Sequence, residues 1–402
     1  MPSFKNWEES NMVEWKKLED LGPYFGGLTG KTKDDFIDGN AKFITYMNVF
    51  TNPSLDISTT GVVRINSGEK QNKIQRGDIL FTGSSETPEE AGMSCVVTDD
   101  LKEDVYMNSF CFGIRLNQPE NYNLGYLKHI LRSNNVRKGI SKSASGVTRF
   151  NISKGRFGKV LIPIPSLSEQ TRIVGVLDTF TASIENLKKQ IAERRKQYDY
   201  YRDQLLDLEG KEGVEMKTLG EICDTLSGFP FDSRQFSETG IRLMRGMNVK
   251  RGFFDFSEEN NKYWVSSHGL EKYLLEANDI IVSMDGSLVG RSFCYLKKEH
   301  LPLLLVQRVA RIRTKENYKY VYHNLTMRFP DYVDKKKTAG AIPHISMKDI
   351  NSFVIPVPSL DEQSRIVSIL DTFEASIANM EAQMKEREKQ YEYYRNKLLT
   401  FE

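Results

Sequence analysis

The stretch Ile162-Pro-Ile-Pro-Ser-Leu-Ser-Glu-Gln-Thr-Arg-Ile-Val174 returns near the end of the chain as Ile355-Pro-Val-Pro-Ser-Leu-Asp-Glu-Gln-Ser-Arg-Ile-Val367. The similarity continues without a gap to Leu206 and Leu399, with roughly two thirds of the paired positions identical. In each copy a serine precedes a glutamate by three residues, which is the spacing of a capping box at the start of a helix. The prolines before it keep the chain extended. Each copy therefore predicts a helix that begins at this motif.

Apolar residues then recur in a 3–4 alternation, from Ile173 to Leu205 in the first copy and from Ile366 to Leu398 in the second. This period is typical of a coiled-coil seam. About 40 residues at ~1.5 Å per residue give a helix of about 60 Å. Two such helices in one chain are expected to pack on each other. Domain termini commonly lie close together, so the second helix is expected to run antiparallel to the first.

The repeat extends beyond the two helices. Val13–Asp20 matches Val214–Glu221, and Met47-Asn-Val49 matches Met247-Asn-Val249. One unit of about 200 residues is thus used twice, and its helix is kept more closely than its remaining part. We expect an α+β protein with internal pseudo-twofold symmetry. Its predicted parts are a first globular domain (residues 1–165), a first helix and linker (166–212), a second globular domain (213–358) and a second helix (359–402).

Short β-rich runs separated by Gly, Ser and Asn indicate that the globular domains are mixed and mainly β. The predicted strands are Gly61–Ile65, Asp78–Thr82, Phe110–Leu116 and Val160–Ile162, with counterparts at Ile241–Met244, Asp279–Ser283, Leu303–Ile312 and Phe353–Ile355. Short helices are predicted at Asn123–Asn134 and Tyr318–Arg328.

The composition fits a folded protein of two or three domains, with 402 residues, 39% hydrophobic and 11% aromatic. Lys and Arg number 56 against 54 Asp and Glu, so any basic surface must be local. The four cysteines and five histidines lack the spacing of a metal site or disulfide framework, which fits a reducing compartment. No leader-like or membrane-spanning run is present, and we expect a cytoplasmic protein.

Two segments resemble catalytic or nucleotide-binding motifs but are incomplete. Gly26-Gly-Leu-Thr-Gly-Lys-Thr32 lacks both the correctly spaced first glycine of a phosphate-binding loop and the preceding strand, so an ordinary turn is expected. Asn52-Pro53 lacks the second proline and aromatic residue of the adenine-methyltransferase loop. We find no catalytic centre and no metal site.

Basic and small polar residues gather in both globular domains, and for any one of them a solvated surface is the simplest role. Together they suggest DNA binding, because Lys and Arg neutralise phosphates while Arg, Asn, Ser and His can contact base edges. The candidate DNA-binding residues are Lys31, Lys33, Asn48, Ser84, Ser85, Lys142, Arg149, Asn151 and Lys154 in the first domain, and Arg234, Arg245, Asn248, Lys250, Arg251, Ser287, Arg291, Lys335, Lys336, Lys337 and His344 in the second.

Over essentially its full length the chain resembles the specificity (S) subunit of type I restriction–modification systems. The most specific feature is the Ile-Pro-x-Pro-Ser-Leu-x-Glu-Gln entry into a long helix, which occurs twice about 200 residues apart. The resemblance implies a non-catalytic DNA reader in which each globular domain binds one half of a bipartite site. It also implies docking of two methyltransferase (M) subunits, with restriction (R) subunits as a further allowed partner. S-adenosylmethionine, ATP and magnesium would belong to those partners, so no cofactor is expected on this chain.

A rival interpretation is a coiled-coil scaffold whose globular ends bind proteins. The divergence of two loop-rich domains on a closely repeated helix favours the DNA reader, because recognition needs variable groups on a rigid support. A third interpretation, an enzyme with its own methyltransferase centre, is opposed by the absent motifs. The target sequence cannot be read from these residues, because base readout depends on loop conformation and DNA shape.

Overall fold

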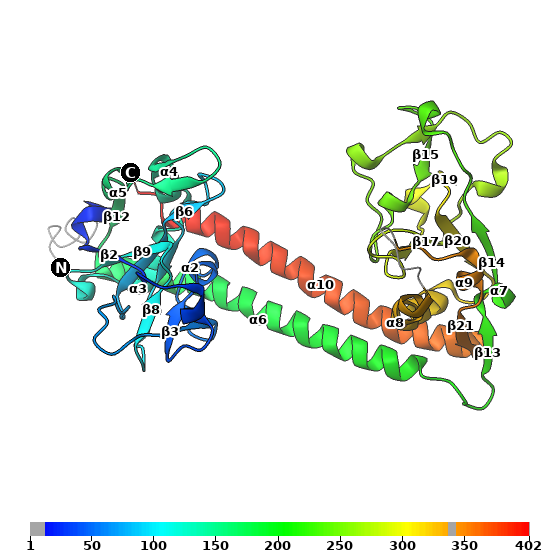
Figure 1. Ribbon diagram of the computed structural model, residues 1–402, viewed down its shortest axis with the longest axis horizontal. Coiled ribbons are helices and arrows are strands. Elements are labelled where there is room, and N and C mark those ends of the chain that lie inside the picture. Colours follow the sequence, from blue (N-terminus) through cyan, green and yellow to red (C-terminus); the bar gives the residue numbers. More distant parts are fainter. Residues whose placement is uncertain (1–12, 337–342, 402) are drawn as a thin grey trace, which may run out of the picture. The chain divides into compact units, whose positions relative to one another are not determined.

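The computed structural model describes residues 13–336 and 343–401, which form two units (Figure 1). Unit 1 comprises Met1–Lys188 and Ala382–Glu402, and unit 2 comprises Lys189–Glu381. Each unit therefore holds one globular domain, the adjoining part of one long helix and part of the other long helix.

Unit 1 is built on a four-stranded antiparallel sheet in the order β2-β9-β5-β7. A three-stranded sheet, β4-β3-β8, pairs β3 parallel with β8, and a third sheet has the order β10-β11-β6. Strand β1, at the start of the domain, pairs antiparallel with β12, which directly precedes the first long helix. The strands are β1 (Glu14–Lys17), β2 (Tyr24–Gly26), β3 (Ala41–Ile44), β4 (Thr60–Val63), β5 (Asp78–Thr82), β6 (Ser84–Ser85), β7 (Ser94–Val96), β8 (Val105–Met107), β9 (Cys111–Arg115), β10 (Ala144–Ser145), β11 (Phe150–Ile152) and β12 (Leu161–Ile164).

The α-helices that begin in unit 1 are α2 (Tyr46–Thr51), α3 (Leu124–Ile130), α4 (Asn134–Lys142), α5 (Lys154–Gly158) and α6 (Leu167–Leu206). The core joins the sheet to both long helices, because Phe81 of β5, Ile173 of α6 and the C-terminal Leu399 are buried in one cluster with Leu18. The central strand β5 is buried at every position, because Ile79 and Phe81 pack in this cluster while Leu80 packs in a second cluster.

Unit 2 repeats this plan. Its four-stranded sheet has the order β14-β20-β17-β18, and its three-stranded sheet has the order β16-β15-β19 with β15 parallel to β19. The strands are β13 (Glu215–Thr218), β14 (Cys223–Ser227), β15 (Ile241–Met244), β16 (Tyr263–Trp264), β17 (Ile280–Ser283), β18 (Phe293–Tyr295), β19 (Leu303–Leu305), β20 (Val309–Thr314) and β21 (Val354–Val357). The α-helices are α7 (Leu219–Ile222), α8 (Tyr318–Lys336), α9 (Met347–Asn351) and α10 (Leu360–Leu398). The matching strand orders confirm the internal repeat.

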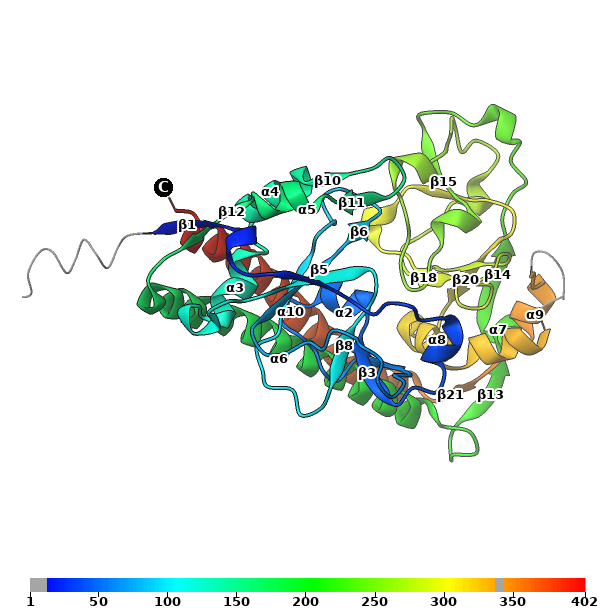
Figure 2. The ribbon, with the colours of Figure 1, turned by 60° about the vertical axis from the view of Figure 1, so that its left-hand side comes forward.

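Within each unit, the parts of α6 and α10 that belong to it lie alongside each other and run in opposite directions (Figures 1 and 2). In unit 1, Phe180 near the start of α6 stacks on Tyr394 near the end of α10, with ring centroids 5.2 Å apart. In unit 2 the equivalent pair is Tyr201 and Phe373, 5.5 Å apart. The predicted antiparallel pairing is therefore confirmed within each unit, as is the predicted fold class.

The repeated motif has a physical role at the start of each helix. The Oγ atoms of Ser166 and Ser359 accept from the N–H groups three residues on, at 3.4 and 3.3 Å. The glutamines that follow, Gln170 and Gln363, are buried. Each donates from Nε2 to the proline carbonyl five residues before it, and each accepts from a backbone N–H at the start of the domain helix, α3 or α8. The glutamine of the repeated motif thus fastens the long helix to its own globular domain.

Two predicted elements differ from the structure. The predicted strand Leu303–Ile312 is two strands, β19 and β20, because Gln307 and Arg308 are exposed and Arg308 has φ 64°. The predicted helix Asn123–Asn134 is likewise divided into α3 and α4, with Ser133 in an extended conformation at the start of α4. No helix among the described residues is long and apolar enough to cross a membrane.

Candidate nucleic-acid interface

In unit 1 several predicted residues gather where β5 leads into β6. Strand β6 pairs with β11, so that Ser84 lies opposite Asn151 and Ser85 opposite Phe150. Figure 2 shows β6, β10 and β11 beside one another. The pairing brings two segments together that are more than 60 residues apart in the sequence, each carrying short polar side chains.

Two neighbouring hollows of about 390 and 380 Å³ share Ser84 in their walls. The first is also lined by Met47, Ser85 and Arg149, and the second by Asn151 and Lys154. The structure therefore brings together five of the residues that the sequence predicted in this domain: Ser84, Ser85, Arg149, Asn151 and Lys154.

Arg149 is exposed but held in place. Its Nε donates to the Ser84 Oγ at 3.0 Å, and its guanidinium lies 5.3 Å from the centre of the Phe110 ring. Phe110 is itself 57% exposed. An arginine stacked on an exposed ring keeps its other donors available to a ligand.

The segment that presents Met47 is anchored by a residue that sequence reasoning missed. Arg132, at the break between α3 and α4, donates to the carbonyls of Val49, Phe50, Thr51 and Asn52 at the end of α2, and to Ser94 of β7. Burial lowers the pKa of Arg132 to about 10, which leaves it charged at neutral pH. Its cation satisfies the last carbonyls of α2. No sequence pattern distinguishes Arg132 from a surface arginine.

Asn48 and Asn248 are a correction to the predicted interface. Both are buried, with side chains 3% and 0% exposed. The Asn48 amide donates to the carbonyls of Asp56 and Thr59, and the Asn248 amide donates to those of Asp255 and Asn260. These amides close equivalent loops in the two units and cannot reach a nucleic acid.

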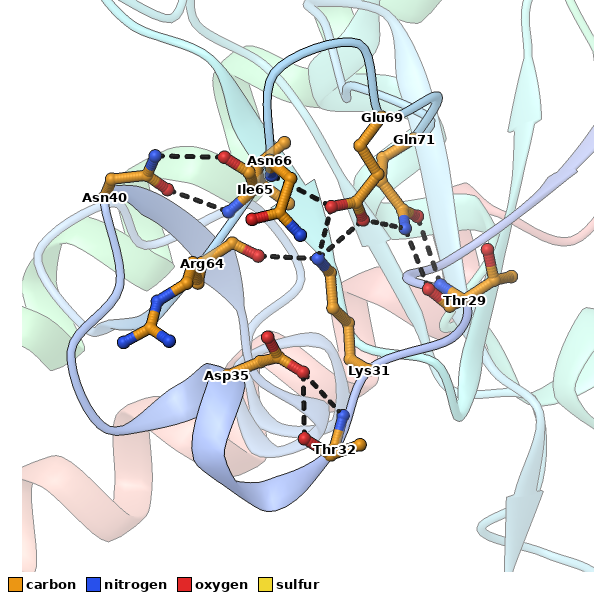
Figure 3. A network of polar contacts seen from close by, with 10 residues as sticks. All are labelled: Thr29, Lys31, Thr32, Asp35, Asn40, Arg64, Ile65, Asn66, Glu69 and Gln71. Atoms are coloured by element: carbon orange, nitrogen blue, oxygen red, sulfur yellow. Dashed lines mark hydrogen bonds and ion pairs between the residues drawn. The ribbon is translucent and has the colours of Figure 1, made fainter.

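Lys31 is a second correction. Its ammonium donates to the Arg64 carbonyl and to Glu69, each at 2.6 Å, and its side chain is almost fully buried (Figure 3). This contact lowers the pKa of the Glu69 carboxyl to about 2. Lys31 therefore ties the loop after β2 to the segment after β4. The expectation that no strand precedes this loop is wrong, because β2 leads directly into it, but the element that follows is only the short 3₁₀ turn Lys33–Phe36 and not the helix that a phosphate-binding loop requires.

In unit 2 one larger hollow of about 620 Å³ occupies the equivalent place. Three of the predicted residues line it: Arg245, Lys250 and Ser287. The Arg245 guanidinium lies 5.6 Å from the Phe236 ring centre. Met247 lines this hollow as Met47 lines its counterpart in unit 1. The Met-Asn-Val turn therefore has the same arrangement in both units, with a buried asparagine and an exposed methionine.

Two charged residues of this wall, Asp285 and Arg308, form a group with His344. The Asp285 carboxylate lies 2.6 Å from Nδ1 of His344 through Oδ1, and accepts from Nη1 of Arg308 at 2.7 Å through Oδ2. His344 was predicted, whereas Asp285 and Arg308 were missed. The two consecutive polar residues Gln307-Arg308 in this β-rich run could have indicated the turn, but the run was predicted as one strand.

The remaining predicted residues lie outside these hollows. Lys33, Lys142 and Arg251 are exposed, and Arg234 forms an exposed ion pair with Asp232. Arg291 binds the Asp334 carboxylate through both terminal nitrogens. Lys335 and Lys336 are exposed in the last turn of α8, and Lys337 lies outside the described residues.

Metal binding has no support in the described ranges 13–336 and 343–401, where no group of three or more His, Cys, Asp or Glu side chains could hold an ion. The four cysteines are free, and burial raises the thiol pKa of Cys95 and of Cys111 to about 12. Because the thiolate is the nucleophilic form, these two thiols are poor nucleophiles, and the two cysteines serve in packing. Together the hollows of the two units present arginine and lysine donors, exposed methionines and the carboxylates of Glu86, Glu90 and Asp285.

Comparison with known proteins gives a consistent result. The family model described as "Type I restriction modification DNA specificity domain" matches residues 12–194 and 211–388. The specificity subunit of the Escherichia coli type I restriction enzyme EcoR124I/EcoR124II is 38% identical over 261 residues, 60% of this chain and 63% of that subunit. The EcoAI specificity subunit, also from E. coli, is 32% identical over 169 residues, 40% of this chain and 28% of that subunit. The matched regions thus span less than two thirds of either relative.

The fold has solved counterparts. The crystal structure of the type I restriction–modification S subunit from M. genitalium superposes with a TM-score of 0.56 at 17% identity, covering 98% of this chain and 97% of that one.

Proposed function

Because this chain belongs to the family of type I restriction modification DNA specificity domains, we propose that it reads a bipartite DNA target with one half-site per unit. The observation that carries the proposal is that the two units share a scaffold but line their hollows with different residues. The strand orders and the buried Asn48 and Asn248 recur in both units, whereas the exposed residues of the two hollows differ. A reader of one symmetric sequence would need no such difference.

The chain has a recognition role and no catalytic one. We propose that methyltransferase subunits dock on the long helices and the domains, one for each unit, because the repeat gives both units the same scaffold and keeps the long helix most alike. S-adenosylmethionine, ATP and magnesium would then be bound by methyltransferase or restriction subunits, and the assembled complex would act in the cytoplasm.

Binding of the methyltransferase-loaded chain to a randomised duplex library at two salt concentrations tests the proposal. A DNA reader selects a two-part sequence and binds with a steep salt dependence, because phosphate contacts release counterions. Replacing Lys335 and Lys336 with alanine is expected to weaken binding to all sequences and to flatten the salt slope by about one unit per lysine. Lys298→Ala, an exposed cation of unit 2 that lies outside the long helices and outside the hollow, is the matched control. Salt-independent, unselective binding would favour the scaffold instead.

A further inference from the structure

Arg308 stands out in the described chain because of its backbone. Within residues 13–336 and 343–401 only two non-glycine residues have positive φ, Asn278 at 73° and Arg308 at 64°. Asparagine tolerates this left-handed region, whereas a long side chain with a Cβ disfavours it. Glycine would fit the tight turn between β19 and β20 at no steric cost. The arginine side chain therefore has a use at this position that offsets the backbone strain.

The turn is clamped to the loop after β17 at two points. The Arg308 carbonyl accepts from the Met284 N–H at 3.0 Å, and the guanidinium binds Asp285 as described above. Asp285 also bridges to His344. The Arg308 side chain is nevertheless 66% exposed and lines the 620 Å³ hollow. Its only hydrogen bond to a described side chain uses Nη1, and Nε and Nη2 form none with the side chains of residues 13–336 and 343–401.

A phosphate is a poor partner for this group. The Asp285 carboxylate lies 2.7 Å from Nη1, so an anion bound to Arg308 would face a second anion at short range. A neutral base edge meets no such repulsion. The planar fork of an arginine matches the O6 and N7 acceptors of guanine in the major groove.

The equivalent turn in unit 1 supports a role in base recognition for this position. There, between β8 (Val105–Met107) and β9 (Cys111–Arg115), the exposed residues are Ser109 and Phe110, and Phe110 is 57% exposed. Two units with the same scaffold thus present a cation at one turn and an aromatic ring at the other. This turn is a position at which the two units differ in chemistry while they agree in backbone topology.

We propose that Arg308 reads a guanine in the half-site bound by unit 2, and that Asp285 is the positioning residue that orients its guanidinium. This inference rests on the proposed function, and it names a specificity-determining contact that the sequence did not predict.

The test compares four variants of the methyltransferase-loaded chain on duplexes in which each position of the selected target is changed singly. Arg308→Gly removes the side chain and suits the positive φ, so folding is preserved. Arg308→Lys keeps the charge without the fork. Asp285→Asn removes the orienting carboxylate. Lys298→Ala is the charge-matched control, because it precedes β19 and lies at the end of that strand opposite the Arg308 turn.

We expect Arg308→Gly to lose about ten- to a hundredfold discrimination at one G·C pair of one half-site, with the other half-site unchanged. Arg308→Lys should not restore it, and Asp285→Asn should weaken discrimination at the same base pair. A uniform loss of affinity that lysine restores would show a phosphate contact and overturn the proposal, as would unchanged discrimination. If the wild-type complex selects no sequence at all, the proposed function itself fails, which is a distinct result.

Discussion

Arg149 is the residue in unit 1 whose surroundings best fit base readout, because Ser84 and the Phe110 ring hold its exposed guanidinium. We expect Arg149→Ala to relax one half-site by about 1–3 kcal/mol and to leave the other unchanged. Binding to singly substituted targets measures this. Lys138→Ala, an exposed cation of α4, is the control. Equal weakening on all sequences would place Arg149 on the phosphate backbone.

His323 makes the stability of unit 2 depend on pH. It is buried in α8 beside Tyr198, with Asp371, Lys319 and Arg202 close by, and burial lowers its pKa from 6.5 to about 4. Between these two values the unfolded chain binds a proton that the folded chain does not, so stability falls as the pH falls through this window. The loss is about 3 kcal/mol for this one group.

Urea unfolding of the wild type and of His323→Gln at neutral pH and at about pH 4.5 checks this expectation. The variant should lose less stability on acidification than the wild type does. His129, the equivalent residue of unit 1, is present in both proteins, and burial lowers its pKa as well. An identical pH dependence of the two proteins would show that His323 does not titrate as described.

At the scale of elements, the attachment of each long helix depends on one buried glutamine. Gln170→Ala leaves the Asn123 N–H and the Pro165 carbonyl without their partner, and Gln363→Ala does the same to Asn317 and Pro358. Each unsatisfied buried group costs about 1–3 kcal/mol. We therefore expect both variants to unfold at clearly lower urea concentration. Ser168→Ala, exposed on the same turn, should change nothing.

The long helices could be predicted from the sequence because a heptad pattern and a cap are local signals, and because the repeat shows each of them twice. The turn at Arg308 was not predicted, because Gln307-Arg308 is a weak signal in a run that also contains Arg311 inside β20, and the positive φ of Arg308 leaves no mark in the sequence. Asn48 and Asn248 were mistaken for surface residues because an asparagine in a turn looks the same whether it faces water or closes a loop. Hydrogen bonds to carbonyls eight or more residues away decide between these roles.

Ser84, Arg149 and Asn151 were predicted as separate candidates, and their meeting depends on the pairing of β6 with β11. Strand pairing over such a separation is set by the whole core and not by local propensity. The sequence therefore supplied the residue types of the interface, whereas its geometry required the fold.

At the scale of the whole molecule, the repeat implies that the chain can be opened elsewhere. The C-terminal Leu399 packs in the same core as Leu18, so both ends of the described chain belong to unit 1. We expect a circular permutant with joined ends to fold and to bind the same target. Its opening should lie between Glu209 and Gly213, because Leu208 is buried in unit 2 whereas residues 209–213 are exposed. A permutant with native secondary structure but a changed target would contradict this.

The last prediction concerns the spacer between the half-sites. Each long helix begins in one unit and ends in the other, so we expect its length to set the preferred spacing. The register of Phe180 with Tyr394 places Leu187 opposite Arg387, and one heptad inserted after each residue preserves the apolar seam.

The insertion adds ~10 Å. DNA rises about 34 Å per ~10 base pairs, so the optimal spacer should grow by about three base pairs. The half-site sequences should stay the same, because no residue of either hollow has changed. Weaker binding is also expected, since three base pairs turn the second half-site by roughly a third of a helical turn. Binding on a ladder of spacer lengths measures the shift, and an unchanged optimum would mean that the helices are a docking surface that does not set the spacing.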